Sequence, residues 1–183
     1  MIQLVGPGGA GKSTVGAMLA RRLGWPFHDL DREFERRRGD IDTFIQAHGY
    51  PTYAHENVAV YLELVPGLED CVLALSSGFM VYPTSVHPAC SGVTAAIARS
   101  RTTVVLLPSL DLETCVAETV RRQLGRPLCR RDPAREETVI RARFDRYMAL
   151  PAPKVETMRS PDEVVAAILA RLGMEPPEKP PAK

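Results

Sequence analysis

Excess charge and long apolar runs are both scarce in this chain. Its 183 residues carry a formal net charge of +1 at pH 7, whereas nucleic-acid binders concentrate positive charge, so we expect no nucleic-acid partner. No apolar run reaches the ~20 residues that cross a bilayer, so we expect no membrane association. Because an apolar strand is predicted from Met1 onwards, we also expect no signal peptide.

Cysteine is rare too, and no two cysteines form a C-x-x-C pair. The four cysteines are widely spaced, at Cys71, Cys90, Cys115 and Cys129. This spacing predicts free thiols in a reducing cytoplasm. A hydrophobic content of 45% and a charged content of 25% are typical of a soluble globular protein. We expect one domain over residues 1–173 and a disordered, proline-rich tail over residues 174–183.

Lysine is scarce among the basic residues, and Lys12 is the only one before Lys154. It lies in the segment GPGGAGKST, residues 6–14, which fits the Walker A phosphate-binding pattern G-x-x-x-x-G-K-[ST]. Glycines let backbone N–H groups surround a phosphate, and the N-terminus of the following helix adds its positive dipole. Lys12 would contact the β- and γ-phosphates, and the Ser13 hydroxyl would bind Mg²⁺. The alternative is a chance match in a glycine-rich turn, which the flanking strand and helix disfavour.

Strands and helices alternate along the chain, which predicts an α/β fold with a parallel sheet between two layers of helices. The predicted strands cover residues 1–5, 27–29, 71–76, 102–107 and 154–157. The predicted helices cover residues 15–23, 32–38, 41–48, 53–64, 83–98, 112–124 and 136–147, with a last one from residue 161. Ser160, Pro161 and Glu163 form the capping-box pattern of a helix N-terminus.

Two carboxylates follow the second predicted strand, at the sheet edge where open α/β sheets bind ligands. Asp29 would hold Mg²⁺ through its water shell, together with Ser13. Asp31 would accept the proton of an attacking hydroxyl. The alternative is that Asp29 and Asp31 only favour the positive end of a helix.

Several arginines and aromatic residues have two interpretations. Arg126 lies in an arginine-rich, proline-punctuated segment, which would deliver charge onto a transferred phosphate as a lid or would be a solvated loop. Arg143 would bind an anion or form surface ion pairs. Tyr53 and His55 would contact a substrate or be ordinary helix residues.

With these motifs in place, the chain from Ile2 to about Leu172 resembles the shikimate kinase family of P-loop small-molecule kinases. The resemblance rests on the phosphate loop, the Asp29-x-Asp31 pair, and three later motifs: Arg126-Pro127-Leu128, Arg143-x-x-x-Tyr147 and Arg159-Ser160-Pro161. It implies a five-stranded parallel sheet, a substrate-binding subdomain at about residues 31–64, and a lid at about residues 121–134. It also implies ATP as phosphoryl donor and a monomer.

The chain departs from the family pattern mainly where the family binds shikimate. The family's Phe-Arg pair, whose arginine holds the substrate carboxylate, is Tyr53-Ala54 here. The family's Gly-Gly-Gly is Ser76-Ser77-Gly78, and its adenine-side arginine is Thr119.

We therefore predict an ATP- and Mg²⁺-dependent kinase for a hydroxyl of a small polar metabolite other than shikimate. Two alternatives remain: a genuine shikimate kinase with a relocated carboxylate anchor such as Arg36 or Arg37, and a non-catalytic nucleotide-binding relic. A GTPase is disfavoured, because the chain's only asparagine is Asn57 and an Asn-Lys-x-Asp motif is absent.

The predicted site comprises four groups of residues. The catalytic residues are Lys12, Asp31 and Arg126. The nucleotide-binding residues are Gly8, Gly9, Ala10, Gly11, Lys12, Ser13, Thr14, Arg126, Arg159 and Pro161. The acceptor-binding residues are Asp31, Tyr53, His55, Ser76, Ser77, Gly78 and Arg143, and the metal ligands are Ser13 and Asp29.

Overall fold

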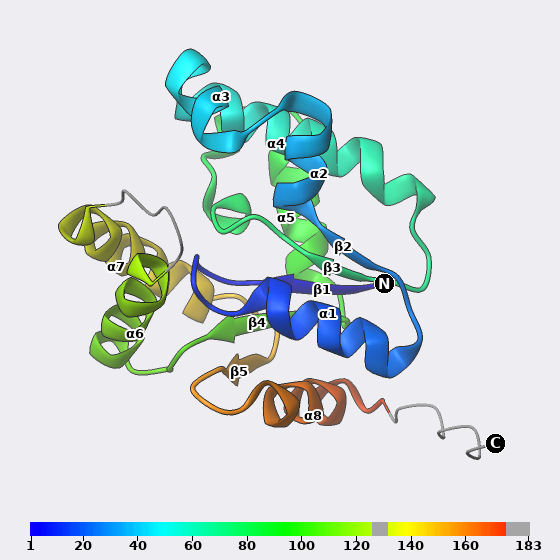
Figure 1. Ribbon diagram of the computed structural model, residues 1–183. Helices are drawn as coiled ribbons and strands as arrows, with labels where there is room; N and C mark the ends of the chain where they lie inside the picture. Colours follow the sequence, from blue (N-terminus) through cyan, green and yellow to red (C-terminus); the bar gives the residue numbers. More distant parts are fainter. Residues whose placement is uncertain (126–131, 175–183) are drawn as a thin grey trace.

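A parallel sheet runs through the middle of the molecule (Figure 1), in a computed structural model that describes residues 1–125 and 132–174. The strands are β1 (Ile2–Val5), β2 (Phe27–Asp29), β3 (Val72–Ala74), β4 (Thr103–Leu107) and β5 (Lys154–Glu156). Their order across the sheet is β2-β3-β1-β4-β5, and every neighbouring pair is parallel. The predicted α/β fold with a five-stranded parallel sheet is confirmed.

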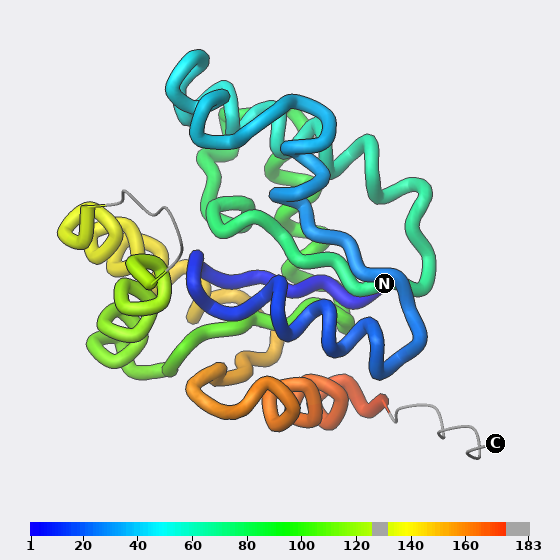
Figure 2. Tube along the Cα trace, in the orientation of Figure 1, coloured from blue at the N-terminus to red at the C-terminus, as the bar shows by residue number. Residues whose placement is uncertain are grey.

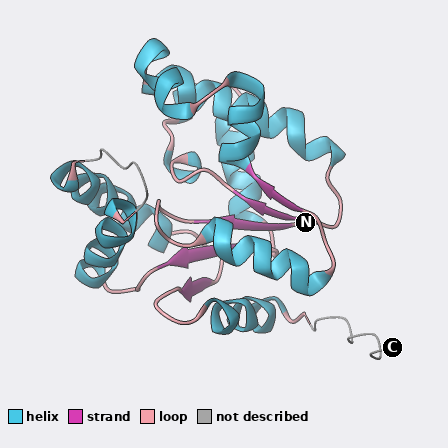
Figure 3. Cartoon of the chain, in the orientation of Figure 1, coloured by secondary structure: helices cyan, strands magenta, loops and turns pink. Residues whose placement is uncertain are grey.

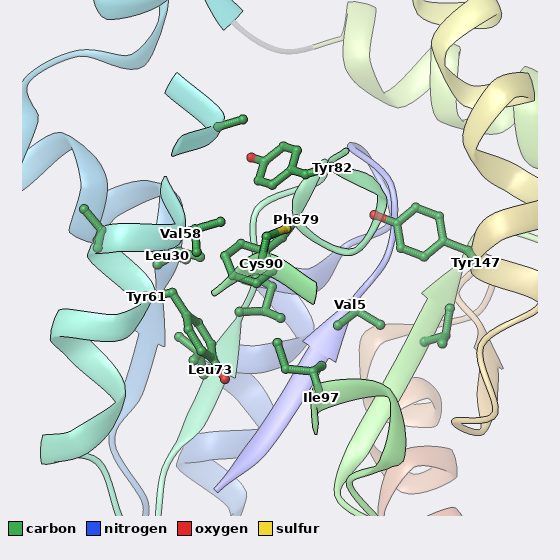
Figure 4. Close-up of a cluster of buried hydrophobic side chains, with 14 of the residues drawn as sticks. Val5, Leu30, Val58, Tyr61, Leu73, Phe79, Tyr82, Cys90, Ile97 and Tyr147 are labelled. Carbon is green, nitrogen blue, oxygen red and sulfur yellow. The ribbon is translucent and has the colours of Figure 1, made fainter. Parts of the chain in front are cut away.

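The strands are buried on both faces because successive side chains point to opposite sides of the sheet. Ile2 and Leu4 of β1 pack with α1 (Lys12–Leu23) and α8 (Pro161–Leu172), which lie on one face (Figure 3). Val5 packs in the cluster on the other face. Figure 4 shows that cluster, in which Val5 lies near aromatic side chains such as Tyr61 and Phe79. Because alternate side chains of a strand point to opposite faces, the core is divided into two layers, one on each side of the sheet.

The second face is covered by α5 (Cys90–Arg99) and by α4 (Tyr50–Leu64), which belongs to a group of three helices above the sheet. That group contains α2 (Leu30–Arg38), α3 (Ile41–His48) and α4, drawn in blue to cyan in Figure 2. The Phe34 and Phe44 rings meet edge to face at 5.2 Å and join α2 to α3. Arg38 forms ion pairs with Glu56 and Glu63, which join α2 to α4. This group occupies the region predicted to bind the acceptor.

Two helices that follow β4 lie beside the carboxyl ends of the strands. They are α6 (Leu112–Leu124) and α7 (Pro133–Met148), each with an aspartate N-cap, Asp111 and Asp132. The capping box predicted at Ser160 and Glu163 is present at the start of α8. Over the described residues, none of the helices combines the length and apolar character needed to cross a membrane.

Three predictions of secondary structure were wrong in detail. The helix predicted over residues 83–98 is a 3₁₀ turn (Thr84–Val86) followed by α5 from Cys90, because Pro83 and Pro88 cannot donate helical hydrogen bonds. A further 3₁₀ turn (Phe79–Val81) was missed. Helices α1, α4 and α7 also begin three residues earlier than predicted; in α4 and α7 an early proline fits the first turn.

Candidate active site

The phosphate loop follows the central strand β1 and enters α1. Gly9 and Gly11 have φ values of 76° and 87°, in the left-handed region where a side chain is strained. Gly11 is the N-cap of α1, and no side chain of the described residues caps that helix. The first turn of α1 also lacks an acidic residue. Its N–H groups and positive dipole end are therefore available to an anion.

Lys12 lies across the mouth of this loop. Its Nζ donates hydrogen bonds to the carbonyl oxygens of Gly6 and Pro7, at 2.7 and 2.8 Å. A compact ammonium group held on a flexible stem above backbone N–H groups is suited to contact phosphate oxygens. The predicted position of Lys12 in a phosphate site is consistent with this geometry.

Asp29 brings β2, α1 and α2 together. Its Oδ2 accepts a hydrogen bond from the Ser13 hydroxyl at 2.5 Å, and its Oδ1 accepts one from the Asp31 backbone N–H at 3.0 Å. Asp29 is therefore both the N-cap of α2 and the neighbour of Ser13. The structure unites the two side chains that the sequence predicts as metal ligands.

These two oxygen donors fit Mg²⁺, which favours hydroxyl and carboxylate oxygens and takes the remainder of its ligands from water and phosphate. Within the described ranges, no group of three or more His, Cys, Asp or Glu side chains could hold a metal by itself.

A cleft of about 310 Å³ opens beside the phosphate loop and α8. Its lining includes several predicted nucleotide-binding residues together with four that were not predicted. The predicted ones are Gly9, Gly11, Thr14, Arg159 and Pro161, and the others are Val15, Arg122, Thr157 and Val164. A lining that combines apolar side chains such as Val15 and Val164 with the guanidinium of Arg122 is suited to the flat face of a base.

Arg122 lines this cleft, although the sequence analysis gave it no role. Its Nη1 donates to the Gly9 carbonyl and the Thr157 hydroxyl, and its Nη2 donates to the Thr157 carbonyl, at 2.8 to 3.2 Å. Thr119, which aligns with the family's arginine, is fully buried and does not line the cleft. Its position one helical turn after Thr119 could have suggested a role for Arg122. Only the packing of α6 shows that the Arg122 side chain points to the phosphate loop.

Glu118 holds Arg122 in this orientation. Its carboxylate accepts hydrogen bonds from Arg121 and from Arg122, the latter at 2.6 Å. These bonds, that from Arg121 first, lower the pKa of Glu118 to about 2. The carboxylate therefore stays ionised and the guanidinium stays directed at the loop across the neutral pH range.

The acceptor side begins at Asp31, on the first turn of α2. The Tyr53 hydroxyl donates to Asp31 Oδ1 at 3.5 Å. Burial, helped by the charge of Asp31, raises the pKa of Tyr53 well above its usual range, so this phenol stays a neutral donor. Burial and the charges of three neighbouring aspartates also raise the pKa of Glu35, one turn after Asp31. The structure thus joins two predicted acceptor-side residues, Asp31 and Tyr53.

Ser76 faces the interior. Its hydroxyl accepts a hydrogen bond from Asn57 Nδ2 at 3.0 Å, and Asn57 Oδ1 accepts one from Tyr82 at 3.2 Å. Asn57 is completely buried and Ser76 is 3% exposed. Ser76 therefore satisfies a buried amide in the protein interior, which the sequence did not indicate.

Arg143 of α7 reaches the loop after β3. Its Nη1 donates to the Ser77 carbonyl at 3.4 Å, and its Nη2 donates to the Tyr50 hydroxyl at 3.0 Å. The space above Gly78 is also taken, because a Cβ built there would lie 2.5 Å from that hydroxyl and 2.7 Å from a Tyr82 ring carbon. The structure brings Arg143, Ser77 and Gly78 together and adds Tyr50, which the sequence analysis missed.

Two predicted residues are not placed in this arrangement. His55 lies on the exposed side of α4, where its Nδ1 contacts the Val86 carbonyl at 2.8 Å and its ring packs 4.7 Å from His87. Arg126 lies outside the described residues, as does most of the lid predicted around it. Ala54, which stands where the family has an arginine, is 1% exposed.

A phosphate loop after the central strand β1, its lysine, and a carboxylate pair where β2 passes into α2, on the far side of β3, define a P-loop phosphotransferase. The comparisons with known proteins agree. The family model for shikimate kinase matches residues 8–173. This chain belongs to the shikimate kinase family.

Individual relatives extend over nearly the whole chain. It is 37% identical over 180 residues to the shikimate kinase of Pseudomonas syringae pv. syringae, covering 95% of this chain and 96% of that protein. The crystal structure of shikimate kinase from Aquifex aeolicus superposes with a TM-score of 0.71 at 27% identity, covering 94% and 95% of the two chains. Shikimate kinase from Acinetobacter baumannii in complex with shikimate gives a TM-score of 0.70 at 26% identity, covering 94% and 92%. Like these relatives, the chain is a small-molecule kinase of a family that uses ATP.

Proposed function

We propose that this protein transfers the γ-phosphoryl group of ATP, with Mg²⁺, to a hydroxyl of a small polar acceptor other than shikimate, in the cytoplasm. The observation that carries the acceptor part is at position 54, where a buried alanine stands in place of the family's carboxylate-binding arginine. The nucleotide part is supported by the phosphate loop, Lys12 and the cleft beside α8.

The residues have distinct tasks in this reaction. Lys12 and the N-terminus of α1 stabilise the negative charge of the transferred phosphoryl group. Asp31 accepts the acceptor's hydroxyl proton as the new O–P bond forms and the bond to ADP breaks. Ser13 and Asp29 would hold Mg²⁺, which when bound neutralises phosphate charge. Tyr53, held 3.5 Å from Asp31 by burial in α4, orients that carboxylate.

The residues on the acceptor side are mainly tyrosines and one guanidinium. Arg143 contacts Tyr50 and Ser77 there. The relocated anchors that the sequence suggested are engaged elsewhere: Arg36 pairs with Glu33, and Arg37 pairs with Glu33 and Glu63. An acceptor held mainly by hydroxyl groups that hydrogen-bond to the phenols fits these residues better than one whose carboxylate needs two arginines.

A genuine shikimate kinase is the second candidate, and the 37% identity to the Pseudomonas syringae enzyme over 95% of the chain favours it. In that case Arg143 would hold the carboxylate with help from Tyr50. A catalytically inactive relic is disfavoured, because nucleotide binding alone needs no carboxylate in the position of Asp31.

A coupled assay for ADP release separates these candidates. The purified protein is given Mg²⁺-ATP with shikimate and with a panel of other hydroxy acids, polyols and hydroxy-amino acids. We expect turnover on a member of the panel and little on shikimate. Turnover of shikimate with a KM in the ordinary range of ~1 μM–1 mM would establish the second candidate. ADP binding without turnover on any acceptor would establish the relic.

A further inference from the structure

A buried glutamine packs against the back of the phosphate loop. Gln123 lies in the last turn of α6 and is 3% exposed. Its Nε2 donates to Glu136 Oε2 of α7 at 3.5 Å, while its Oε1 has no hydrogen-bond partner among the described residues. A buried carbonyl without a partner is costly.

Gly8 of the phosphate loop meets this side chain directly. A Cβ built on Gly8 would overlap Gln123 Nε2 and would lie 3.1 Å from its Cδ. Gly8 is not among the glycines with positive φ, so its backbone conformation does not require glycine. Space does. The amide of Gln123 occupies the volume that a side chain at position 8 would take.

The rest of the same helical turn also faces the loop. A Cβ on Gly9 would lie 3.2 Å from the Thr119 carbonyl and 3.5 Å from Gln123 Cγ. Arg122 Nη1 donates to the Gly9 carbonyl at 3.2 Å. The end of α6 therefore forms a wall behind Gly8 and Gly9, and Figure 1 shows α6 and α7 beside the loop that leaves β1.

We propose that Gln123 is a positioning residue for the phosphate loop, which it ties to α7 through Glu136. Its amide supports the loop at Gly8 from the side of α6. Without it, Gly8 would border a cavity and the loop would have to be ordered when the nucleotide binds, at a cost in affinity. This inference rests on the proposed function only in taking ATP and ADP as the ligands of the loop.

A double-mutant cycle tests the pair. ADP affinity is measured by calorimetry, with Mg²⁺, for wild type, Gly8→Ala, Gln123→Ala and the double variant. We expect Gly8→Ala to weaken binding about tenfold, because the new methyl group displaces the buried amide, and Gln123→Ala about three- to tenfold. The double variant should bind no more weakly than Gly8→Ala, since truncation of Gln123 makes room for the methyl group. Losses that simply multiply in the double variant would overturn the pairing.

Two further variants separate support of the loop from support of the fold. Gln123→Met keeps the side-chain volume but loses the bond to Glu136, so we expect it to have an intermediate ADP affinity. Leu124→Ala alters the next residue of α6, which is 39% exposed, and should leave ADP affinity unchanged. A Gln123→Ala protein with a lower Tm but wild-type ADP affinity would overturn the proposal. Because these measurements need no acceptor, ADP binding without turnover would contradict the proposed function and leave this inference standing.

Discussion

The nucleotide side of this site consists largely of backbone groups, whereas the acceptor side consists of side chains. On the nucleotide side, the phosphate loop, the N-terminus of α1 and the Arg122 contacts with Gly9 and Thr157 depend largely on backbone groups. On the acceptor side, Asp31, Tyr50, Tyr53 and Arg143 meet through their side chains. A backbone cradle needs glycines and a helix, and these are kept here. A site made of side chains can change its specificity on an unchanged fold, which is what we propose for this protein.

The two sides also differ in what lies beneath them. Behind the loop, Gln123 fills the space above Gly8. On the acceptor side, Asn57 links Ser76 to Tyr82 in a buried hydrogen-bonded network. Substitutions of Ser76 therefore affect stability as well as specificity, because each member of such a network satisfies another.

The largest expected effect is on the nucleotide side. Lys12→Ala should lower turnover about a thousandfold or more, the size of effect of a cation at a transferred phosphoryl group. Lys12→Arg should not restore it, because the planar guanidinium is not an equivalent of the compact ammonium that contacts Gly6 and Pro7. Steady-state ADP release measures both variants. Normal turnover in Lys12→Ala would show that this loop is not the phosphate site.

The next prediction distinguishes the role of Asp29 on the nucleotide side from the role of Asp31 on the acceptor side. Asp31→Asn should lower turnover about a hundredfold with unchanged ADP affinity, because a base acts only in the chemical step. Asp29→Asn should instead raise the Mg²⁺ concentration needed for half-maximal rate. Asparagine caps helices as well as aspartate does, so α2 should keep its N-cap in Asp29→Asn. Identical behaviour of the two variants in a Mg²⁺ titration would contradict this division.

Restoring the family's residues on the acceptor side should raise activity on shikimate. A charge-assisted hydrogen bond is worth ~1.5–3 kcal/mol, so Ala54→Arg with Ser76→Gly and Ser77→Gly should raise kcat/KM for shikimate about ten- to a hundredfold. The structure adds a cost, because Ser76→Gly leaves the buried Asn57 amide without its acceptor, at about 1–3 kcal/mol. The double variant Ala54→Arg/Ser77→Gly should therefore be the more stable protein by thermal unfolding. No gain on shikimate in either variant would show that position 54 does not set the specificity.

The smallest expected effect comes from Tyr50→Phe, which removes one neutral hydroxyl from Arg143. The freed guanidinium should change the KM of the accepted substrate about two- to tenfold, while kcat stays within about a factor of two. Leu62→Ala, an exposed change farther along α4, is the matched control. A change in kcat with constant KM would place Tyr50 in the chemical step.

Local patterns in the sequence were sufficient for much of the molecule. The phosphate loop, the Asp29–Asp31 pair and the Ser160 capping box are short-range signals, and each depends on residues a few positions apart. The alternation of apolar strands with helices likewise predicted the parallel sheet. The boundaries that failed, at Pro83 and before Tyr53, are places where a proline can either begin or interrupt a helix and only the surroundings decide.

Only the tertiary structure decided which side chains meet across the fold. Arg143 and Tyr50 are 93 positions apart, and Gln123 lies far along the chain from Gly8. The sequence marked Ser76 as an acceptor-binding residue and left Arg122 unassigned, because a residue type does not reveal which face of a helix or loop packs inward. The strand order and the packing of α4, α6 and α7 settle those directions. Motifs are read from neighbours in the chain, whereas an acceptor site is a set of long-range contacts that exist only after the chain has folded.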